Sequence, residues 1–218
     1  MKIDDYYHHV LLPANRAVSQ LRRAGLPVDL ARLEATVKDW EHRLHELTAY
    51  VEGEAITRGC ALKYSRDAFG VDQRKLAEFL YGKLGLDVYK YTDPSKTYPQ
   101  GQPSTDDQAL MVYASLAVPR SDDHPIVRAI LQIRSLAKGR GTYGAAFRRT
   151  RRADGACHPH FNWAVVRTPR LSASDPPVHQ IPERADMLVA DAIKSWFVPG
   201  VAPPPSREAW DPRMHGSC

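Results

Sequence analysis

Residues 30–51, LARLEATVKDWEHRLHELTAYV, decide the fold class because their apolar residues recur at steps of three and four. This spacing places the apolar side chains along one face of a long helix. Asp29 precedes the stretch and is expected to cap its first turn. The stripe predicts a helix that packs on another helix of the same molecule, and a homodimeric coiled coil is the alternative. The stripe residues are Leu30, Leu33, Val37, Trp40, Leu44, Leu47 and Val51.

Helical patterns continue on both sides of this stretch. We expect a short lead-in helix in residues 1–28 that stops at Gly25 and Pro27. Residues 53–72 are expected to be irregular. Three further helices are predicted downstream, in VDQRKLAEFLYGKLGL (71–86), after STDD (104–107) with Ser104 or Thr105 as its cap, and in HPIVRAILQIRSLAK (124–138).

The polar stretch from Lys90 to Pro103 separates two of these helices. It is rich in Thr, Ser, Pro, Gly and Tyr, and it is long for a loop in a compact domain. This length indicates a segment that is mobile or contacts a ligand.

The pattern changes after about residue 150. Residues 157–182 alternate between apolar and polar side chains and are broken by prolines, which is typical of short strands and turns. Residues 184–197 return to a helical pattern. The prediction is therefore an α+β chain with a lead-in helix (1–28), a helical arm (29–150), a small partial β segment with a C-terminal helix (151–200) and a proline-rich tail (201–218).

Composition narrows the class of protein further. The chain has 218 residues, 43% of them apolar, and a formal net charge of +5. These values exclude a collagen, a disulfide scaffold and a wholly disordered protein, and the positive excess fits an anionic partner. No apolar run approaches the roughly 18 residues that a membrane span needs, and no signal peptide is recognisable. Because the three cysteines are far apart, we expect reduced thiols and a cytoplasmic protein.

A run of basic residues between positions 134 and 152 contains no acidic residue. Glycines let the backbone approach a partner closely, and Thr142 and Tyr143 add hydroxyl groups. Basic side chains, hydroxyls and backbone N–H groups at a helix end are typical ligands of phosphate oxygens. Contact with phosphate or nucleic acid is the prediction, and a solvated basic surface is the alternative. The basic residues are Arg134, Lys138, Arg140, Arg148, Arg149, Arg151 and Arg152.

Two other motifs are less specific indicators of function. Residues 139–144, GRGTYG, spell a G-x-G-x-x-G, but a dinucleotide site requires a strand before the motif, and here a helix precedes it. The segment Cys157-His158-Pro159-His160 offers three potential metal ligands. A strand beside a turn is the preferred interpretation of that segment.

The most specific stretch is RTPRLSASDPPVHQIP, residues 167–182. It combines a central arginine, several hydroxyls and an amide next to a histidine on a strand–turn–strand pattern. Such a frame can place an arginine in a DNA minor groove, where acceptor atoms are common to every base pair.

This stretch resembles the family A DNA polymerases, which include bacterial repair polymerases and phage replicases. The family writes it approximately as T-G-R-L-S-S-x-D-P-N-L-Q-N-I-P. The positions that match are Thr168, Arg170, Leu171, Ser172, Asp175, Pro176, Ile181 and Pro182. Residues 71–86 are similar to the family's Q-L-A-E-F-L-F-E-K-L-G-L helix, and residues 124–143 are similar to its helix ending L-A-K-L-K-S-T-Y. The resemblance covers about residues 8–200.

The resemblance implies that residues 29–150 form a thumb and residues 151–200 part of a palm. It implies that the thumb contacts the backbone of primer–template DNA, that Arg170 lies in the minor groove, and that Ser172, His179 and Gln180 touch the primer or template strand. The complete set of expected DNA-binding residues is Arg134, Lys138, Arg140, Thr142, Tyr143, Arg148, Thr168, Arg170, Ser172, His179 and Gln180.

The chain also departs from the family. Pro169 stands where the family has Gly, Pro177 replaces Asn, and Gly139 and Gly141 replace Leu and Ser. The family's D-Y-S-x-I-E and H-D-E motifs, whose aspartates hold two metal ions, do not occur in these residues. We therefore expect no cofactor on this chain and no polymerisation by it alone.

The expected function is a subunit of a split polymerase, in which a second polypeptide carries the remaining palm, the fingers and the Mg²⁺ site. Gene fission in a phage-like genome would produce such a heterodimer. A non-catalytic module that binds duplex DNA by itself is the alternative.

Overall fold

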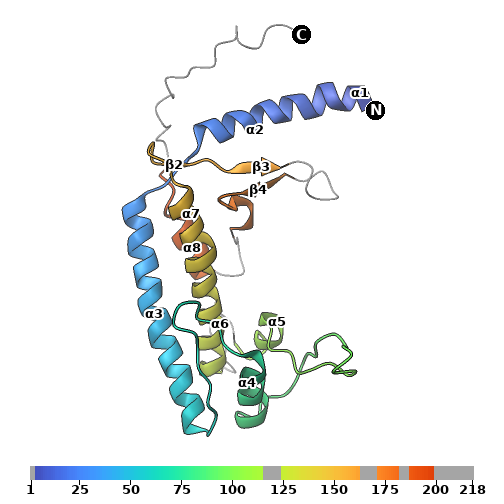
Figure 1. Cartoon of the computed structure of the whole chain (residues 1–218), viewed down its shortest axis with the longest axis vertical. Helices are drawn as coiled ribbons and strands as arrows, with labels where there is room; N and C mark the ends of the chain where they lie inside the picture. The colour runs from blue at the N-terminus through green and yellow to red at the C-terminus, as the bar shows by residue number, and fades with distance from the viewer. Residues whose placement is uncertain (1–2, 115–123, 163–170, 182–186, 199–218) are drawn as a thin grey trace. The chain divides into compact units, whose positions relative to one another are not determined.

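The structure is a computed structural model that describes residues 3–114, 124–162, 171–181 and 187–198. Its elements are drawn in Figure 1. In chain order they are α1 (Ile3–Tyr6), a π-helical segment (Tyr7–Leu11), α2 (Leu12–Ala24), β1 (Leu26–Pro27), α3 (Leu30–Thr57), α4 (Gln73–Ala77), a second π-helical segment (Glu78–Lys83), α5 (Asp107–Leu110), α6 (Pro125–Lys138), a third π-helical segment (Gly139–Gly144), α7 (Ala145–Thr150), β2 (Ala156–Cys157), β3 (His160–Asn162), β4 (Ser172–Ser174), a 3₁₀ turn (Val178–Gln180) and α8 (Met187–Lys194).

The described residues are mostly helical, and their strands form two small antiparallel pairs. Strand β1 pairs with β2, and β3 pairs with β4 so that Phe161 lies opposite Ala173. The predicted α+β class with a dominant helical part is confirmed. The stretch 178–180 forms a 3₁₀ turn.

The chain divides into two compact units. One unit comprises Met1–Ala35, Thr142–Ile181 and Ala192–Cys218, and the other comprises Thr36–Gly141 and Pro182–Asp191. We call them unit 1 and unit 2. The four sequence ranges predicted as domains are not tested by this division and stay predictions.

Helix α3 confirms the long helix predicted from the apolar stripe. Asp29 caps it by accepting a hydrogen bond from the Arg32 amide at 3.0 Å. Five of the seven stripe residues are buried, whereas Leu47 is half-buried and Leu30 is 37% exposed, so the stripe packs inside the molecule from Leu33 onward. The prediction that residues 53–72 are all irregular is wrong for the first five, because Ala55 extends the buried stripe by four residues and the helix continues to Thr57.

Side-chain caps set the starts of the two short helices that follow. Asp72 caps α4 by accepting from the Arg74 amide at 2.8 Å. Asp106 caps α5 by accepting from the Ala109 amide at 2.8 Å, so the prediction of Ser104 or Thr105 as the cap is wrong. Ser104 and Thr105 are instead buried. Ser, Thr and Asp are all good caps, and here Ser104 and Thr105 pack in the interior while Asp106 stays at the surface.

The core of unit 2 is built from α3, α4, α6 and the segments between them (Figure 1). Eleven of its side chains are at most 3% exposed and come from all three helices and the segments between them, so these elements share one apolar interior. They are Val37, Trp40, Leu44, Leu62, Leu76, Phe79, Leu80, Leu110, Ile126, Ile130 and Ile133.

The core of unit 1 gathers around Phe147 of α7. Its ring makes edge contacts with Trp196 and Phe197, whose centroids lie 5.9 and 5.5 Å away. Cys157 on β2 is fully buried and free, and burial raises the pKa of its thiol. Among the described residues, no helix is both long and apolar enough to cross a membrane.

Candidate nucleic-acid interface

The basic run lies on α6, the π-helical segment after it and α7. Gly139 begins the π-helical segment, and its position leaves no room for a side chain. A Cβ there would lie 2.9 Å from both the Trp40 ring and Val189. No strand precedes this GRGTYG segment, since α6 runs directly into it, so the environment of a dinucleotide-binding loop is missing.

Arg140 is held within unit 2 by three groups. Its Nε donates to Glu41 at 2.7 Å, and its Nη1 donates to the Asp67 carbonyl at 3.0 Å. Its guanidinium also lies 5.6 Å from the centre of the Phe69 ring. About a third of the Arg140 side chain stays exposed (32%), so one face of the guanidinium can still meet solvent or a ligand.

Arg134 is the most enclosed of the expected basic residues in unit 2. It forms an ion pair with Asp107 at 2.7 Å and donates to the Thr105 carbonyl at 2.6 Å. Its side chain is 25% exposed. These contacts fix the start of α5 against α6, which gives Arg134 a structural role whatever else it contacts.

Lys138 differs from both arginines. It lies in the last turn of α6, is exposed, and has no ion pair or hydrogen bond to any described side chain. Lys138 is therefore available to an anionic ligand without the loss of an existing contact.

In unit 1, the expected contact residues of helix α7 and the preceding turn are split between surface and interior. Thr142 is exposed. Tyr143 is 1% exposed, and its hydroxyl donates a hydrogen bond to the Gln180 carbonyl. Arg148 makes a two-pronged ion pair with Glu34, with N···O distances of 2.7 and 2.5 Å.

Strand β4 and the 3₁₀ turn bring three expected contact residues together in unit 1. The Ser172 hydroxyl donates to the Asn162 carbonyl at 3.3 Å. The Ala173 amide donates to His179 Nδ1 at 3.0 Å, which leaves Nε2 as the protonated nitrogen of the neutral ring. His179 and Gln180 are exposed. Thr168 and Arg170 lie outside the described residues.

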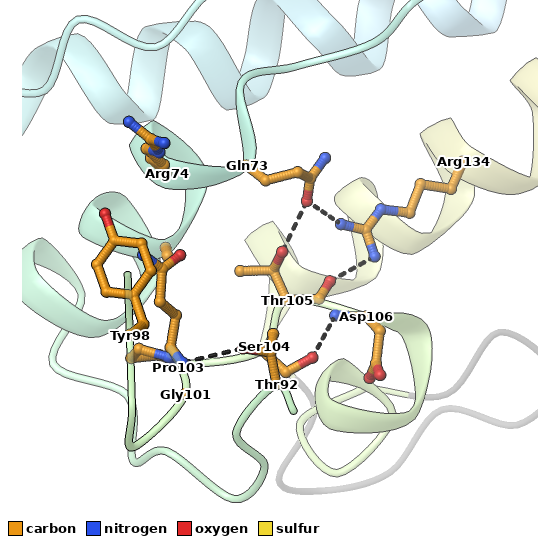
Figure 2. A pocket seen from close by; sticks show the side chains of 12 residues that line it. Gln73, Arg74, Thr92, Tyr98, Gly101, Pro103, Ser104, Thr105, Asp106 and Arg134 are labelled. Carbon is orange, nitrogen blue, oxygen red and sulfur yellow. Dashed lines mark hydrogen bonds between the residues drawn. The ribbon is translucent and has the colours of Figure 1, made fainter. Parts of the chain in front are cut away.

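A cavity of about 720 Å³ lies in unit 2 beside α4 and is shown in Figure 2. One side is a bonded group in which Thr105 and Arg134 both donate to Gln73 Oε1, at 2.7 and 3.4 Å. Arg74 and Tyr98 lie on the other side (Figure 2). Sequence reasoning flagged the 90–103 stretch but gave no signal for Arg74, because a lone surface arginine carries no pattern.

Hydrogen bonds between its two ends hold the stretch from Lys90 to Pro103 beside the cavity. The Thr92 amide donates to the Gln102 carbonyl at 2.8 Å, and the Gln102 amide donates to the Thr92 hydroxyl at 2.9 Å. Gly101 has a φ of +75°, and any Cβ there would collide with the Thr92 carbonyl oxygen. The base of the loop is therefore closed by these contacts between Thr92 and residues 101–102.

Metal ligands do not gather in the part of the chain that the structure describes. No three His, Cys, Asp or Glu side chains in it are placed to hold one ion. His158 is engaged by the Arg22 carbonyl at 2.7 Å and by Asp154 at 2.8 Å. The described His, Cys, Asp and Glu side chains therefore do not form a Mg²⁺ site, and we derive no chemical step through a metal from them.

Comparison with known proteins matches most of this chain. The family model described as DNA polymerase family A covers residues 40–202. A thermostable DNA polymerase I of Thermus filiformis is 30% identical over 88% of this chain and 20% of its own length. The DNA polymerase I of Bacillus subtilis is 28% identical over 89% of this chain and 19% of its length, and the DNA polymerase of Escherichia phage T5 is 27% identical over 96% and 22%.

Among solved structures, the POL domain of Pol1 from M. smegmatis in complex with DNA primer-template and dNTP has a similar fold. The TM-score is 0.66 at 22% identity, and the match covers 89% of this chain and 30% of that one. The chain thus spans about a fifth of the length of the curated relatives it matches. Because the family model matches well over half of its residues, the chain belongs to DNA polymerase family A.

Proposed function

We propose that this chain is the duplex-gripping portion of a family A DNA polymerase, with residues 29–150 acting as a thumb and residues 151–200 as part of a palm. One observation carries the proposal: the family match over residues 40–202 contains both the basic run and the 172–180 segment. The similar solved domain, whose title names a DNA primer-template, supports duplex DNA as the partner.

The grip on DNA rests first on the phosphate backbone. Lys138 meets a phosphate directly, because no described side chain competes for it. When DNA binds, Arg140 and Arg148 each replace their glutamate partner with a phosphate oxygen. Their pairs with Glu41 and Glu34 are one third to one half exposed, and exposed ion pairs contribute little to stability. Contacts of this kind are independent of base sequence and weaken as salt rises.

The second element of the grip is the turn that carries His179 and Gln180. Because the Ala173 amide donates to Nδ1 of the exposed His179, Nε2 is the ring nitrogen that can donate to a ligand. The side chain of Gln180 is exposed, while its carbonyl is tied to Tyr143. Donors at this position suit the acceptor atoms that all base pairs present in the minor groove. Tyr143 acts through this turn as a positioning residue.

We propose that the metal chemistry comes from a second polypeptide. That partner carries the remaining palm with the aspartates for Mg²⁺ and the fingers, and it forms a heterodimer with this chain. Such a division leaves this chain with binding and positioning and gives the partner nucleotide transfer through two metal ions.

The DNA contacts are tested by Lys138→Ala with Lys83→Ala as a matched control. Both lysines are exposed in unit 2, and each variant removes one positive charge. Lys138→Ala should weaken binding to a hairpin duplex and reduce the slope of log K against log salt by about 0.9. Fluorescence anisotropy measures both. Equal behaviour of the two variants would show that Lys138 does not contact the DNA.

The division of labour is tested by primer extension with Mg²⁺. We expect no extension by the chain alone and extension when a polypeptide with the missing motifs is added. Extension by the purified chain alone would refute the proposed division. Duplex binding without any gain from the partner would support the stand-alone binding module instead.

A further inference from the structure

The cavity beside α4 has no part in the duplex contacts proposed above. Its volume of about 720 Å³ lies within the range of small-ligand sites, roughly 300–1,000 Å³. Its wall is formed largely by apolar groups, among them Ala77, Pro103 and the Tyr98 ring. A ligand with a flat apolar body fits such a wall.

The charge around this cavity is positive and concentrated on Arg74. Arg74 is exposed and makes no ion pair or hydrogen bond through its side chain with any residue that the structure describes. Asp106 is the acidic residue that lines the cavity, and its carboxylate is occupied by Lys90 at 2.5 Å. Arg134 is neutralised by Asp107. Because the positive charge of Arg74 has no partner among the described residues, we expect a ligand of this cavity to carry an anionic group.

Tyr98 supplies an exposed aromatic face on a turn whose backbone is hydrogen-bonded. Its ring is 39% exposed. Its backbone is held in a turn in which the Tyr98 amide donates to the Ser95 hydroxyl at 3.1 Å. The side-chain amide of Gln102, on the same loop, has no partner among the described residues and can pair with the edge of a heterocycle. An exposed aromatic ring offers a face on which a base can stack.

We propose that this cavity binds an unpaired nucleotide of single-stranded DNA, with its base on Tyr98 and its phosphate on Arg74. A ligand that joins an anion to a planar heterocycle would satisfy both Arg74 and Tyr98, which lie on the same side of the cavity. A continuous strand is favoured over a free nucleotide because two more rings are exposed nearby in the sequence, Tyr91 on the same loop at 57% and Tyr89 just before it at 59%. Successive bases can stack on such a series of rings.

The test measures binding of a fluorescein-labelled thymidine octanucleotide to the full 218-residue chain by anisotropy. Tyr98→Ala and Arg74→Ala should each weaken binding about tenfold, which is the size expected for the loss of one stacked base or its phosphate contact. Tyr98→Phe keeps the ring and should bind as the parent chain does. Lys75→Ala removes an equal charge from the neighbouring residue of α4, which does not line the cavity, and should change affinity by less than about threefold.

The proposal is overturned if Arg74→Ala binds no worse than Lys75→Ala, or if Tyr98→Ala binds as tightly as Tyr98→Phe. Photocrosslinking with 5-iodouracil in the same oligonucleotide should label Tyr98, and a label confined to other residues would contradict the site. A free thymidine nucleotide that binds as tightly as the octanucleotide would overturn the choice of a strand. Tighter binding of a proline-rich peptide would overturn the ligand class.

The octanucleotide and the hairpin duplex separate the two proposals. A normal Lys138 effect on the hairpin together with no Tyr98 effect on the octanucleotide would reject this cavity and leave the proposed function intact. The reverse pattern would reject the duplex grip and retain the cavity.

Discussion

Replacing Gly139 by alanine tests the close packing at the junction of α6 and the π-helical segment. The new Cβ would lie 2.9 Å from the Trp40 ring and from Val189, which is closer than non-bonded carbons approach. Both neighbours are themselves buried, at 3% and 2% exposure, so neither can move freely. Gly141→Ala is the matched control, because nothing lies within 4 Å of its Cβ position.

The magnitude follows from two opposing effects. Overpacking a core by one methyl group costs about 1–3 kcal/mol. Replacing glycine by alanine in a helical conformation contributes about 1 kcal/mol of stability at either position, since both glycines have negative φ. The difference between the two variants cancels the second effect. Gly139→Ala should therefore be less stable than Gly141→Ala by about 1–3 kcal/mol.

Urea unfolding followed by circular dichroism measures this difference, and thermal melting should show a Tm lower by about 2–12 °C at about 2–4 °C per kcal/mol. If Gly139→Ala equals or exceeds Gly141→Ala in stability, the packing of Trp40 against this turn is not as described.

Three further predictions concern a cap, a titration and a buried hydrogen bond. Asp72→Ala should lower the free energy of unfolding by about 1 kcal/mol in urea, because the α4 amides lose their acceptor; unchanged stability would contradict the cap. Burial lowers the pKa of His124 below its usual value, so the unfolded chain binds the extra proton and stability should fall as pH drops from about 6.5 toward the folded pKa. Replacing His124 by Asn should flatten this part of the pH profile, and an unaltered profile would assign the effect to other groups. Tyr143→Phe leaves the Gln180 carbonyl without its donor and should cost about 1 kcal/mol while weakening hairpin binding; normal stability with weakened binding would instead indicate a direct Tyr143 contact with DNA.

The helical part of the fold is readable from the sequence because its signals are local. The stripe through Leu44 and Val51 and the cap at Asp29 lie within the helix that they define. The error at residues 53–57 arose because Ala55 is a weak hydrophobic signal, although its position continues the stripe. The cap of α5 was misassigned because Ser, Thr and Asp are all good caps, and packing decided which one remained at the surface.

The site was less predictable because its contacts join distant residues. The Arg140–Glu41 pair spans 99 positions and the Arg148–Glu34 pair spans 114, and nothing in the local sequence announces either one. Burial of Tyr143 is likewise set by tertiary packing, so residue type alone suggested a surface hydroxyl. The cavity beside α4 depends on how the 90–103 loop folds back, for which its length was the only signal.

The salt dependence of duplex binding tests the central claim most directly. The full chain is titrated with a labelled primer–template hairpin at several salt concentrations. The proposed grip predicts that log K falls linearly with log salt, with a slope of about −0.9 for each phosphate contacted. A slope near zero, or no binding at low salt, would contradict the claim that this chain holds duplex DNA.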